Sequence, residues 1–317
     1  MHPQIATVFM VNLKYNKWKG HLAVLGANLI FGLNVPVTKA LLTDWMTPWG
    51  YMATRTLVAV CVFWVAQCFL PKEKVKGKDL FIIAVGGIMG FVISQYLTAL
   101  SLEYTSPVYF SLIVALSPVV VMLLAALFLK EPITRRKVAG VALGVVGALL
   151  LIAEASGAAA GSNNLIGISL AVVSITTYSV YLIIMRSVAQ RYSAVTQMKW
   201  MFLFTAIILL PLGLNELDQQ TIYSSAWGWD GVLELAFVAL FSTAIGYFLM
   251  PSGMKFLRAT TVSVYMNLQP VVASVAAIFV GQDIFSWEQP IAAALVIAGA
   301  YVVTTSRSKD DMRQSDR

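Results

Sequence analysis

Long apolar runs separated by short polar connections dominate this sequence and constrain its fold more than any other feature. Each run is about 20 residues long, the length that an α-helix needs to cross a ~30 Å hydrocarbon layer. Only 12% of the 317 residues are charged, whereas soluble domains carry about 25%. The sequence therefore predicts an all-α membrane protein. We expect ten transmembrane helices, at residues 20–40, 48–70, 80–100, 107–129, 137–154, 165–185, 197–214, 231–250, 260–280 and 289–306.

Positive charge is confined to alternate connections. Of the 22 Lys and Arg residues, all except Lys39 and Arg55 lie before the first run, after the last, or in or at the border of every second connection. The positive-inside rule keeps such connections in the cytoplasm. The pattern predicts an even number of spans in a cell inner (plasma) membrane, with both termini cytoplasmic. It also accounts for the net charge of +7 without a nucleic-acid partner, and it makes membrane lipids the expected surroundings.

An internal repeat relates the two halves of the chain. A shift of 152 positions aligns residues 116–152 with residues 268–304 and places Pro118 on Pro270. Five spans are an odd number, so the second copy would enter the membrane from the opposite side. Inverted repeats recur in secondary transporters, whose substrate sites lie near the midplane between the repeats. We expect two inverted five-helix repeats with cytoplasmic ends, organised as 1–19 (leader), 20–155 (first repeat), 163–306 (second repeat) and 307–317 (tail).

Four segments carry a family resemblance. NLIFGLNVPVTKALL (28–42) and TPWGYMATRTLVAV (47–60) are similar to the first two helices of the EamA family of the drug/metabolite transporter superfamily, including an Arg early in the second helix. Residues 99–134 resemble its third-to-fourth helix region, and residues 257–272 resemble the equivalent part of its second repeat. Gln282-Asp283 departs from the family's usual Gly-Glu. The resemblance implies ten spans and an exporter or permease for amino acids, other metabolites or toxic compounds.

Polar side chains within the spans are candidates for a transport pathway, because such groups are costly in lipid and tend to face the bundle interior. Tyr, Asn and Gln can hydrogen-bond amide, amine or carboxylate groups, while ring faces hold an apolar or cationic part. The alternative is that these groups only bridge helices. The candidates are Asn34, Thr38, Arg55, Gln95, Tyr96, Tyr178, Tyr181, Tyr247, Tyr265, Asn267 and Gln269.

Arg55, Lys39 and two prolines raise more specific expectations. Arg55 is the only basic residue placed deep in a span, where it would pair with a carbonyl or carboxylate, line the cavity or contact substrate. Lys39 lies near the outer end of the first span and would either snorkel outward or guard an outer gate. Pro118 and Pro270 interrupt the fourth and ninth spans and are candidate hinges.

Other function classes lack their motifs. The sequence contains no G-x-x-x-x-G-K-[ST] phosphate loop and no HExxH pair or Cys/His cluster, so we expect no ATPase, no metal and no cofactor. An intramembrane enzyme would need a nucleophile–base or acid pair, and no His, Asp or Glu lies mid-span. The favoured prediction is a secondary transporter that exports small metabolites or drugs by alternating access, as a monomer or homodimer. An uptake permease is the alternative, and an intramembrane enzyme is less favoured.

Overall fold

The computed structural model describes residues 3–114, 116–129, 134–136, 138–140, 142–143, 146–147, 150, 164–257, 262, 265–266, 268–282, 285 and 287–305. Helices, turns and loops make up these residues, and no β-strand occurs among them. The tail 307–317 and most of the predicted fifth span lie outside the described residues. We refer to the described residues up to 129 as the N-terminal half and to those from 164 onward as the C-terminal half.

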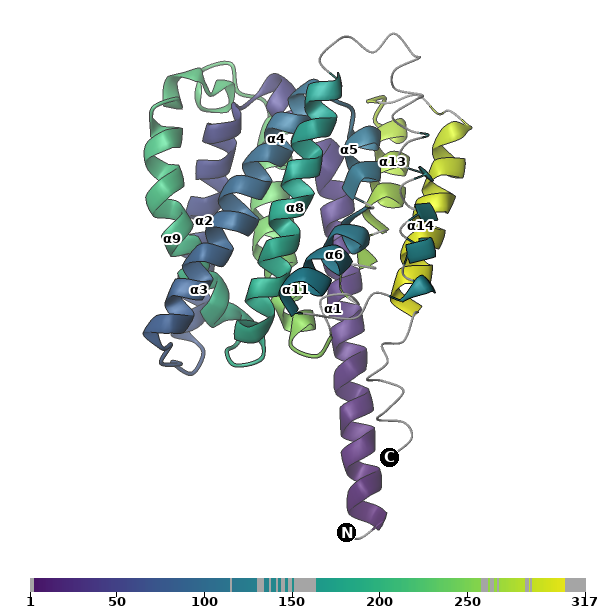
Figure 1. Ribbon diagram of the computed structural model, residues 1–317. Coiled ribbons are helices and arrows are strands. Elements are labelled where there is room, and N and C mark those ends of the chain that lie inside the picture. The colour runs from purple at the N-terminus through teal and green to yellow at the C-terminus, as the bar shows by residue number, and fades with distance from the viewer. Residues whose placement is uncertain are drawn as a thin grey trace.

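Each half consists of helices that stand side by side in one bundle (Figure 1). The N-terminal half contains α1 (Pro3–Asp44), α2 (Pro48–Cys68), α3 (Gly77–Gly87), η1 (Ile88–Ile93), α4 (Ser94–Tyr104), α5 (Pro107–Val114) and α6 (Ser117–Leu129). The C-terminal half contains α8 (Asn164–Ala189), α9 (Ala194–Leu214), η2 (Leu217–Gln219), η3 (Thr221–Tyr223), α10 (Trp229–Ala236), η4 (Phe237–Gly246), α11 (Tyr247–Met254), α13 (Leu268–Phe279) and α14 (Glu288–Thr305). The segments η2 and η3 are short 3₁₀ turns in the loop between α9 and α10.

Length and composition identify membrane-spanning helices in both halves. Six helical runs are long and apolar enough to cross a bilayer: Trp18–Asp44, Pro48–Cys68, Gly77–Tyr104, Asn164–Ala189, Ala194–Leu214 and Trp229–Met254. Shorter apolar helices cover Ser117–Phe128 and Leu268–Phe279. The predicted all-α, multi-pass membrane architecture is therefore confirmed for the described residues. The count of ten spans and the inverted relation between the halves remain predictions.

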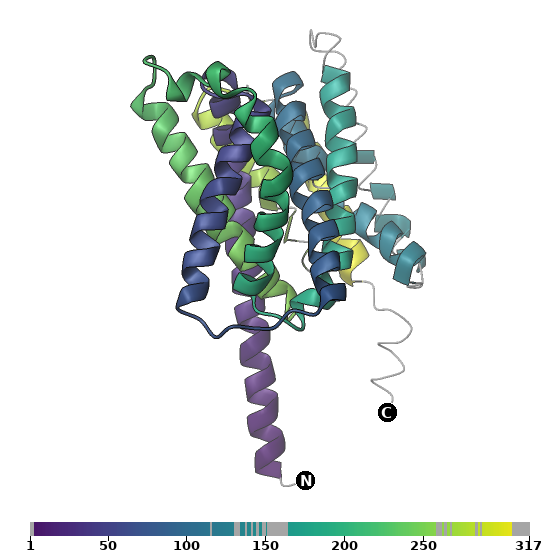
Figure 2. The same cartoon turned by 90° about the vertical axis from the view of Figure 1, so that its left-hand side faces the viewer.

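The first helix is much longer than the predicted span. α1 continues from Pro3 to Asp44 without a break, although we placed a separate leader at 1–19. Its N-terminal part projects away from the bundle in both views (Figures 1 and 2). The leader and the first span thus form one helix in this structure.

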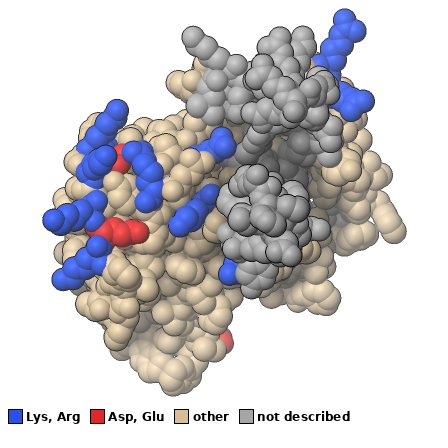
Figure 3. All heavy atoms as spheres, turned by 90° about the horizontal axis from the view of Figure 1, so that it is seen from below, with Lys and Arg blue, Asp and Glu red and all other residues tan. Residues whose placement is uncertain are grey.

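The connections at the two ends of the bundle differ in charge. The loops after α2 and α8 lie at the lower end in Figure 1, whereas those after α1, α4 and α9 lie at the upper end. Lys and Arg side chains crowd the described part of the lower face (Figure 3). They include the exposed residues Lys72, Lys74, Lys76, Lys78, Arg191 and Lys255. The upper loops described here carry acidic residues instead, such as Asp44, Glu216 and Asp218.

A buried carboxylate joins the two halves at the basic face. Asp79, at the start of α3, is 2% exposed. Its carboxylate accepts a hydrogen bond from the Tyr192 hydroxyl at 2.8 Å and lies 3.0 Å from Nη1 of Arg191. Both partners belong to the short connection between α8 and α9. The start of α3 is therefore held against the second half.

Glu73 makes a second connection at the same face. It accepts hydrogen bonds from the backbone N–H and the hydroxyl of Ser193, the N-cap of α9, at 2.9 and 3.0 Å. Burial alone would raise the pKa of Glu73. Hydrogen bonds from Thr196 and Ser193 and the charge of Lys255 outweigh burial and hold this pKa below its usual value. Glu73 is thus ionised at neutral pH, which suits its position at a helix N-terminus.

The predicted span 107–129 is divided into α5 and α6. Proline removes a backbone N–H, and its ring clashes with the carbonyl four residues earlier. For Pro118 that carbonyl belongs to Val114, where α5 ends. The hydroxyl of Ser117 donates to this freed carbonyl at 2.5 Å. Pro118 therefore interrupts the predicted span, and Ser117 satisfies the end of the helix before it.

Two π-helical segments interrupt the remaining long runs. η1 lies between α3 and α4, and η4 lies between α10 and α11. In η4 the Thr243 hydroxyl donates to the Val238 carbonyl five residues earlier, at 2.9 Å. Such segments shift the register of the side chains that follow and are frequent at functional sites. Here they shift the register of the side chains in the middle of the two long helical runs.

The two halves interlock rather than lie apart. α2 packs against α9 and η4, α3 packs against α9, and α5 packs against α13. α1 packs against α11, η4 and α13, while α8 packs against α4, η1, α5 and α6. The bundle core is consequently an interface between the halves.

We predict that this interface tolerates no added methyl group at Gly90. A Cβ built on Gly90, in η1, overlaps the Tyr181 ring of α8, whereas a Cβ on Gly77 meets no atom within 4 Å. Overpacking a filled core costs about 1–3 kcal/mol. Gly90→Ala should lower the free energy of unfolding by that amount in detergent, as measured by denaturant titration. Gly77→Ala is the control, and equal stability of the two variants would contradict the described packing.

Candidate functional site

A cavity of about 70 Å³ lies in the bundle between the two halves. Eight lining residues come from the N-terminal half and seven from the C-terminal half. They are Phe31, Asn34, Val35, Ser94, Gln95, Thr98, Phe110, Val114, Ser174, Ile175, Tyr178, Ser242, Tyr247, Met266 and Gln269. None of these side chains is an acid, a base or a His. The cavity therefore combines aromatic rings with neutral hydrogen-bonding groups.

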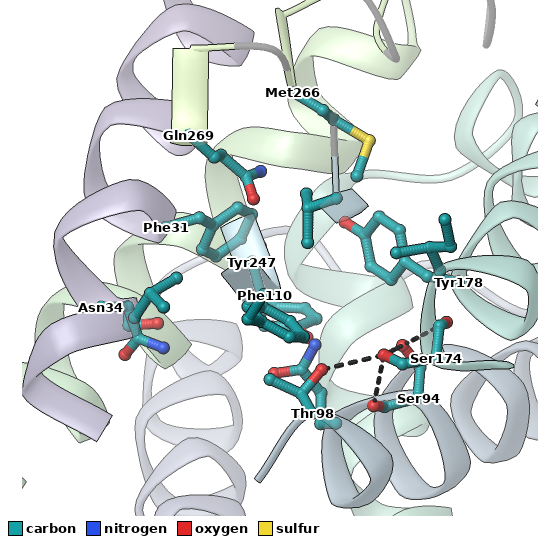
Figure 4. A pocket seen from close by; sticks show the side chains of 15 residues that line it. Phe31, Asn34, Ser94, Thr98, Phe110, Ser174, Tyr178, Tyr247, Met266 and Gln269 are labelled. Carbon is teal, nitrogen blue, oxygen red and sulfur yellow. Dashed lines mark hydrogen bonds between the residues drawn. The ribbon is translucent and has the colours of Figure 1, made fainter. Parts of the chain in front are cut away.

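Five of the sequence-predicted pathway residues meet at this cavity. Asn34 comes from α1, Gln95 from α4, Tyr178 from α8, Tyr247 from α11 and Gln269 from α13. Figure 4 shows Asn34 and Gln269 on one side, and Tyr178 opposite them with its hydroxyl turned inward. The structure thus brings together residues that are far apart in the sequence.

Some polar atoms at the cavity have no partner among the described residues. They include Oδ1 of Asn34 and the hydroxyl oxygen of Ser242, both of which are buried. Gln269 differs, because its amide nitrogen donates to Oδ1 of Asn28 at 2.6 Å. Buried polar atoms are usually hydrogen-bonded. The two unpaired atoms are available to water or to a bound molecule.

Hydroxyl groups connect the halves along one wall. The Ser94 hydroxyl donates to the Ser174 carbonyl at 3.0 Å, and the Ser174 hydroxyl donates to the Ser94 carbonyl at 2.9 Å. Oγ1 of Thr98 lies 2.9 Å from Oγ of Ser174 (Figure 4). This wall is held by reciprocal hydrogen bonds between α4 and α8, as the helix-bridging interpretation of such residues expects.

Arg55 lies behind the cavity wall and is 1% exposed. Its Nε donates to Oγ1 of Thr243 at 2.9 Å. Its Nη1 donates to the Tyr51 hydroxyl at 2.6 Å and to Oε1 of Gln95 at 3.3 Å. The guanidinium carbon is 5.0 Å from the centre of the Phe91 ring and 5.1 Å from that of Tyr51. The structural contacts of Arg55 are therefore with hydroxyls, an amide and ring faces.

Four other candidates lie outside the cavity lining. The hydroxyls of Thr38 and Tyr51 are 3.2 Å apart. Tyr96 stacks on Trp49 with ring centres 3.8 Å apart, and Tyr181 packs behind Tyr178 at 5.3 Å. The Tyr265 hydroxyl lies 2.8 Å from Nδ1 of His21. The contacts of Thr38, Tyr96 and Tyr265 connect different helical segments, whereas Tyr178 and Tyr181 both lie on α8. Asn267 lies outside the described residues.

The gate and hinge candidates occupy distinct places. Lys39 donates from Nζ to the Leu102 carbonyl, so it links the C-terminal ends of α1 and α4. Pro118 and Pro270 lie in the first turns of α6 and α13. The residues four positions before them, Val114 and Met266, both line the cavity.

Sequence reasoning missed several lining residues. Phe31 and Phe110 read as ordinary apolar residues, and Met266 did as well. Ser242 was one of many Ser and Thr residues within apolar runs. A signal for Ser242 existed in its neighbour Thr243, which lies four positions before the candidate Tyr247. The apolar lining residues gave no such signal, because a membrane-spanning helix is apolar on every face.

The arrangement suits reversible binding of a small molecule. Ring faces hold apolar groups, and unpaired amide and hydroxyl groups fix orientation, which is typical of small-molecule sites. No group of three or more His, Cys, Asp or Glu residues in the described part of the chain could hold a metal ion.

Comparison with known proteins identifies the family. The model of the EamA-like transporter family matches residues 18–153 and again residues 165–305. The chain belongs to the EamA-like transporter family. It is thus a multi-pass membrane protein of a drug/metabolite transporter family, as the resemblance of its helical motifs implied.

Similar proteins come from distant organisms. The uncharacterized transporter YyaM of Bacillus subtilis is 26% identical, over 90% of this chain and 93% of its own length. A WAT1-related protein of Arabidopsis thaliana is 24% identical, over 90% of this chain and 78% of its own length. One crystal structure superposes with a TM-score of 0.65 at 21% identity and covers 90% of this chain and 96% of that one. At this identity it supports the fold alone.

We predict that the Ser174 hydroxyl contributes to the interface whereas that of Ser179 does not. Both are buried on α8, but Ser179 bonds only the Ile175 carbonyl within its own helix, at 2.6 Å. Interhelical hydrogen bonds in membranes contribute about 0.6 kcal/mol on average and up to about 1.7. Ser174→Ala should lower the free energy of unfolding in detergent by about 1 kcal/mol, and Ser179→Ala should change it by less. Equal losses would count against the bridging network.

Proposed function

We propose that this protein is a secondary transporter that exports small metabolites, such as amino acids or related compounds, or drugs by alternating access. The observation that carries the proposal is the cavity itself, which both halves line in nearly equal share. Family membership supports transport in general. The substrate class and the direction are the finer parts of the proposal.

We infer that the halves are two inverted repeats, residues 20–155 and 163–306, with ten spans in total. The packing of the helices supports this inference. The contacts that α1 makes with helices of the second half have counterparts in the contacts that α8 makes with helices of the first half. α1 against α11 and η4 corresponds to α8 against α4 and η1, and α1 against α13 corresponds to α8 against α6.

Two pairs of positions related by the shift of 152 line the same cavity. Val114 and Met266 are so related, and both line the cavity at a helix break. Gln95 corresponds to Tyr247, another lining residue. Residues 88–93 of η1 correspond to residues 240–245, which lie within η4. Broken helices near the midplane are a feature of transporters built from inverted repeats.

Alternating access requires the cavity to widen, because small-molecule sites usually measure about 300–1,000 Å³ and this cavity measures about 70 Å³. At the basic face the ion pair between Asp79 and Arg191 holds the two halves together. At the opposite face the Thr47 hydroxyl donates to Glu216 at 2.5 Å and accepts from Gln220 at 2.8 Å. In our proposal one set of contacts opens at a time, and the helix breaks at the two prolines serve as hinges.

The proposed location is the cell inner membrane, with both termini in the cytoplasm. The basic face would then be cytoplasmic under the positive-inside rule. The protein would act in lipid as a monomer or homodimer, because each chain supplies both walls of its own cavity.

Export is tested by untargeted mass spectrometry of the medium of cells that overexpress the protein. Asn34→Leu removes an amide with an unpaired oxygen from the cavity. Losing a hydrogen bond of about 1.4 kcal/mol costs roughly tenfold. We expect a metabolite enriched outside wild-type cells and reduced about tenfold or more with Asn34→Leu.

The matched control is Asn215→Leu, which makes the same change at the exposed end of α9. It should export like the wild type at equal membrane abundance. Depletion of a medium component by wild-type cells would instead favour the alternative, an uptake permease. Equal export by Asn34→Leu and wild type would refute the assignment of the cavity as the substrate site.

The orientation is tested with single cysteines in a background of Cys61→Ala and Cys68→Ala. Ser225 lies in an exposed loop at the acidic face, and Lys74 lies in an exposed loop at the basic face. In spheroplasts a membrane-impermeant maleimide should label Ser225→Cys directly and Lys74→Cys only after permeabilisation. The opposite order would place the basic face outside.

A further inference from the structure

Arg55 is a buried cation whose described surroundings contain no anion. It is 1% exposed, and its three hydrogen bonds go to Thr243, Tyr51 and Gln95, which are all neutral. Nη2 has no hydrogen-bond partner among the described residues, and none of their carboxylates forms an ion pair with it. A buried charge without a counter-charge is costly. In membrane proteins such a charge commonly marks a substrate or ion pathway.

Gln95 connects this cation to the cavity. Its Oε1 accepts from Arg55, while its side chain lines the cavity. No described residue accepts from its amide nitrogen, so the two amide hydrogens remain available to a bound molecule. Tyr247 also lines the cavity, and its ring centre lies 5.3 Å from that of Phe91, which packs on Arg55. Arg55 therefore makes one end of the cavity positive, and Gln95 offers donors there.

The rest of the lining carries no full charge. Phe31, Phe110 and Tyr178 contribute rings, and Asn34 and Ser242 contribute neutral polar atoms. A single guanidinium neutralises one negative charge. A dianion such as a phosphate monoester would leave one charge uncompensated in a low-dielectric site. The chemistry thus fits a ligand with one negative charge and an otherwise neutral, partly apolar body.

We propose that the cavity binds small organic monoanions, with the carboxylate at the Gln95 end, where it compensates Arg55, and the apolar part against Phe31, Phe110 and Tyr178. This inference rests on the proposed transport function and names its substrate class. A carboxylate there accepts from the Gln95 amide and, after a small shift of that side chain, from Nη2 of Arg55. Arginine suits this role because its planar fork matches carboxylate geometry.

The test uses purified protein in detergent and pairs of probes that differ only in charge. The pairs are benzoate with benzamide, 3-phenylpropionate with 3-phenylpropionamide, and hexanoate with hexanamide. A ligand that binds the folded state raises the unfolding temperature. We expect at least one carboxylate to raise it by about 5 °C at a hundredfold excess over its Kd. Its amide should bind at least tenfold more weakly.

Two variants assign the effect to Arg55. Arg55→Gln should abolish the preference for the carboxylate, and Arg55→Lys, which keeps the charge but loses the fork, should retain part of it. Lys199→Gln is the matched control, because Lys199 is another buried cation, on α9, that packs on Trp64 and Trp200 away from the cavity. It should respond like the wild type.

If Arg55→Gln does not fold, the comparison of each carboxylate with its amide on the wild-type protein tests the proposal by itself. Equal stabilisation by acid and amide, or no stabilisation by any of the three carboxylates, would overturn the proposal. So would a carboxylate preference that survives in folded Arg55→Gln. Export of a neutral compound that Asn34→Leu abolishes and Arg55→Lys leaves unchanged would refute the anion site while upholding transport.

Discussion

Lipid offers no hydrogen-bond partner to a backbone, so a helix within the membrane can be interrupted only where protein or a water-filled cavity covers the interruption. The interruptions in the described helices obey this constraint closely. The breaks at Val114 and Met266 border the cavity, η4 contributes Ser242 to it, and η1 leads directly into the lining residues of α4. Irregular backbone is thus concentrated at the interface of the halves. The same places supply both the polar lining and the points at which helices can bend.

Much of the architecture was predictable, because the bilayer acts on every residue of a span. Apolar length gave the positions of the long helices, and alternate positive charge predicted a basic face such as the one in Figure 3. The large polar residues were also informative, since lipid leaves few reasons to keep an amide at mid-span. Asn34, Gln95 and Gln269 line the cavity for this reason. Tyr96 and Tyr265 satisfy the same rule by bridging helices, so the rule finds the interior without identifying the site.

The features that could not be predicted from the sequence depend on tertiary contacts. Pro118 was visible, yet membrane helices often tolerate proline, and only the bond from Ser117 to the Val114 carbonyl explains a clean break here. Arg55 was also visible, but its partner Thr243 is 188 residues away and reaches it from a π-helical segment. Phe31 is chemically indistinguishable from a lipid-facing Phe. Its place in the lining follows from packing between halves, which no local pattern encodes.

Arg55 also departs from the approximate symmetry that relates the core residues of the two halves. Its neighbours include related positions from the two halves: Phe91 corresponds to Thr243, and Gln95 corresponds to the cavity residue Tyr247. α2 and α9 are equally long and their N-caps, Thr47 and Ser193, are 146 positions apart, so the counterpart of Arg55 itself is Met201, which is buried. Met201 is neutral, so this charge occurs in one half only. A cavity between matched walls with a cation at one end is polar, and a charged substrate can bind there in one orientation.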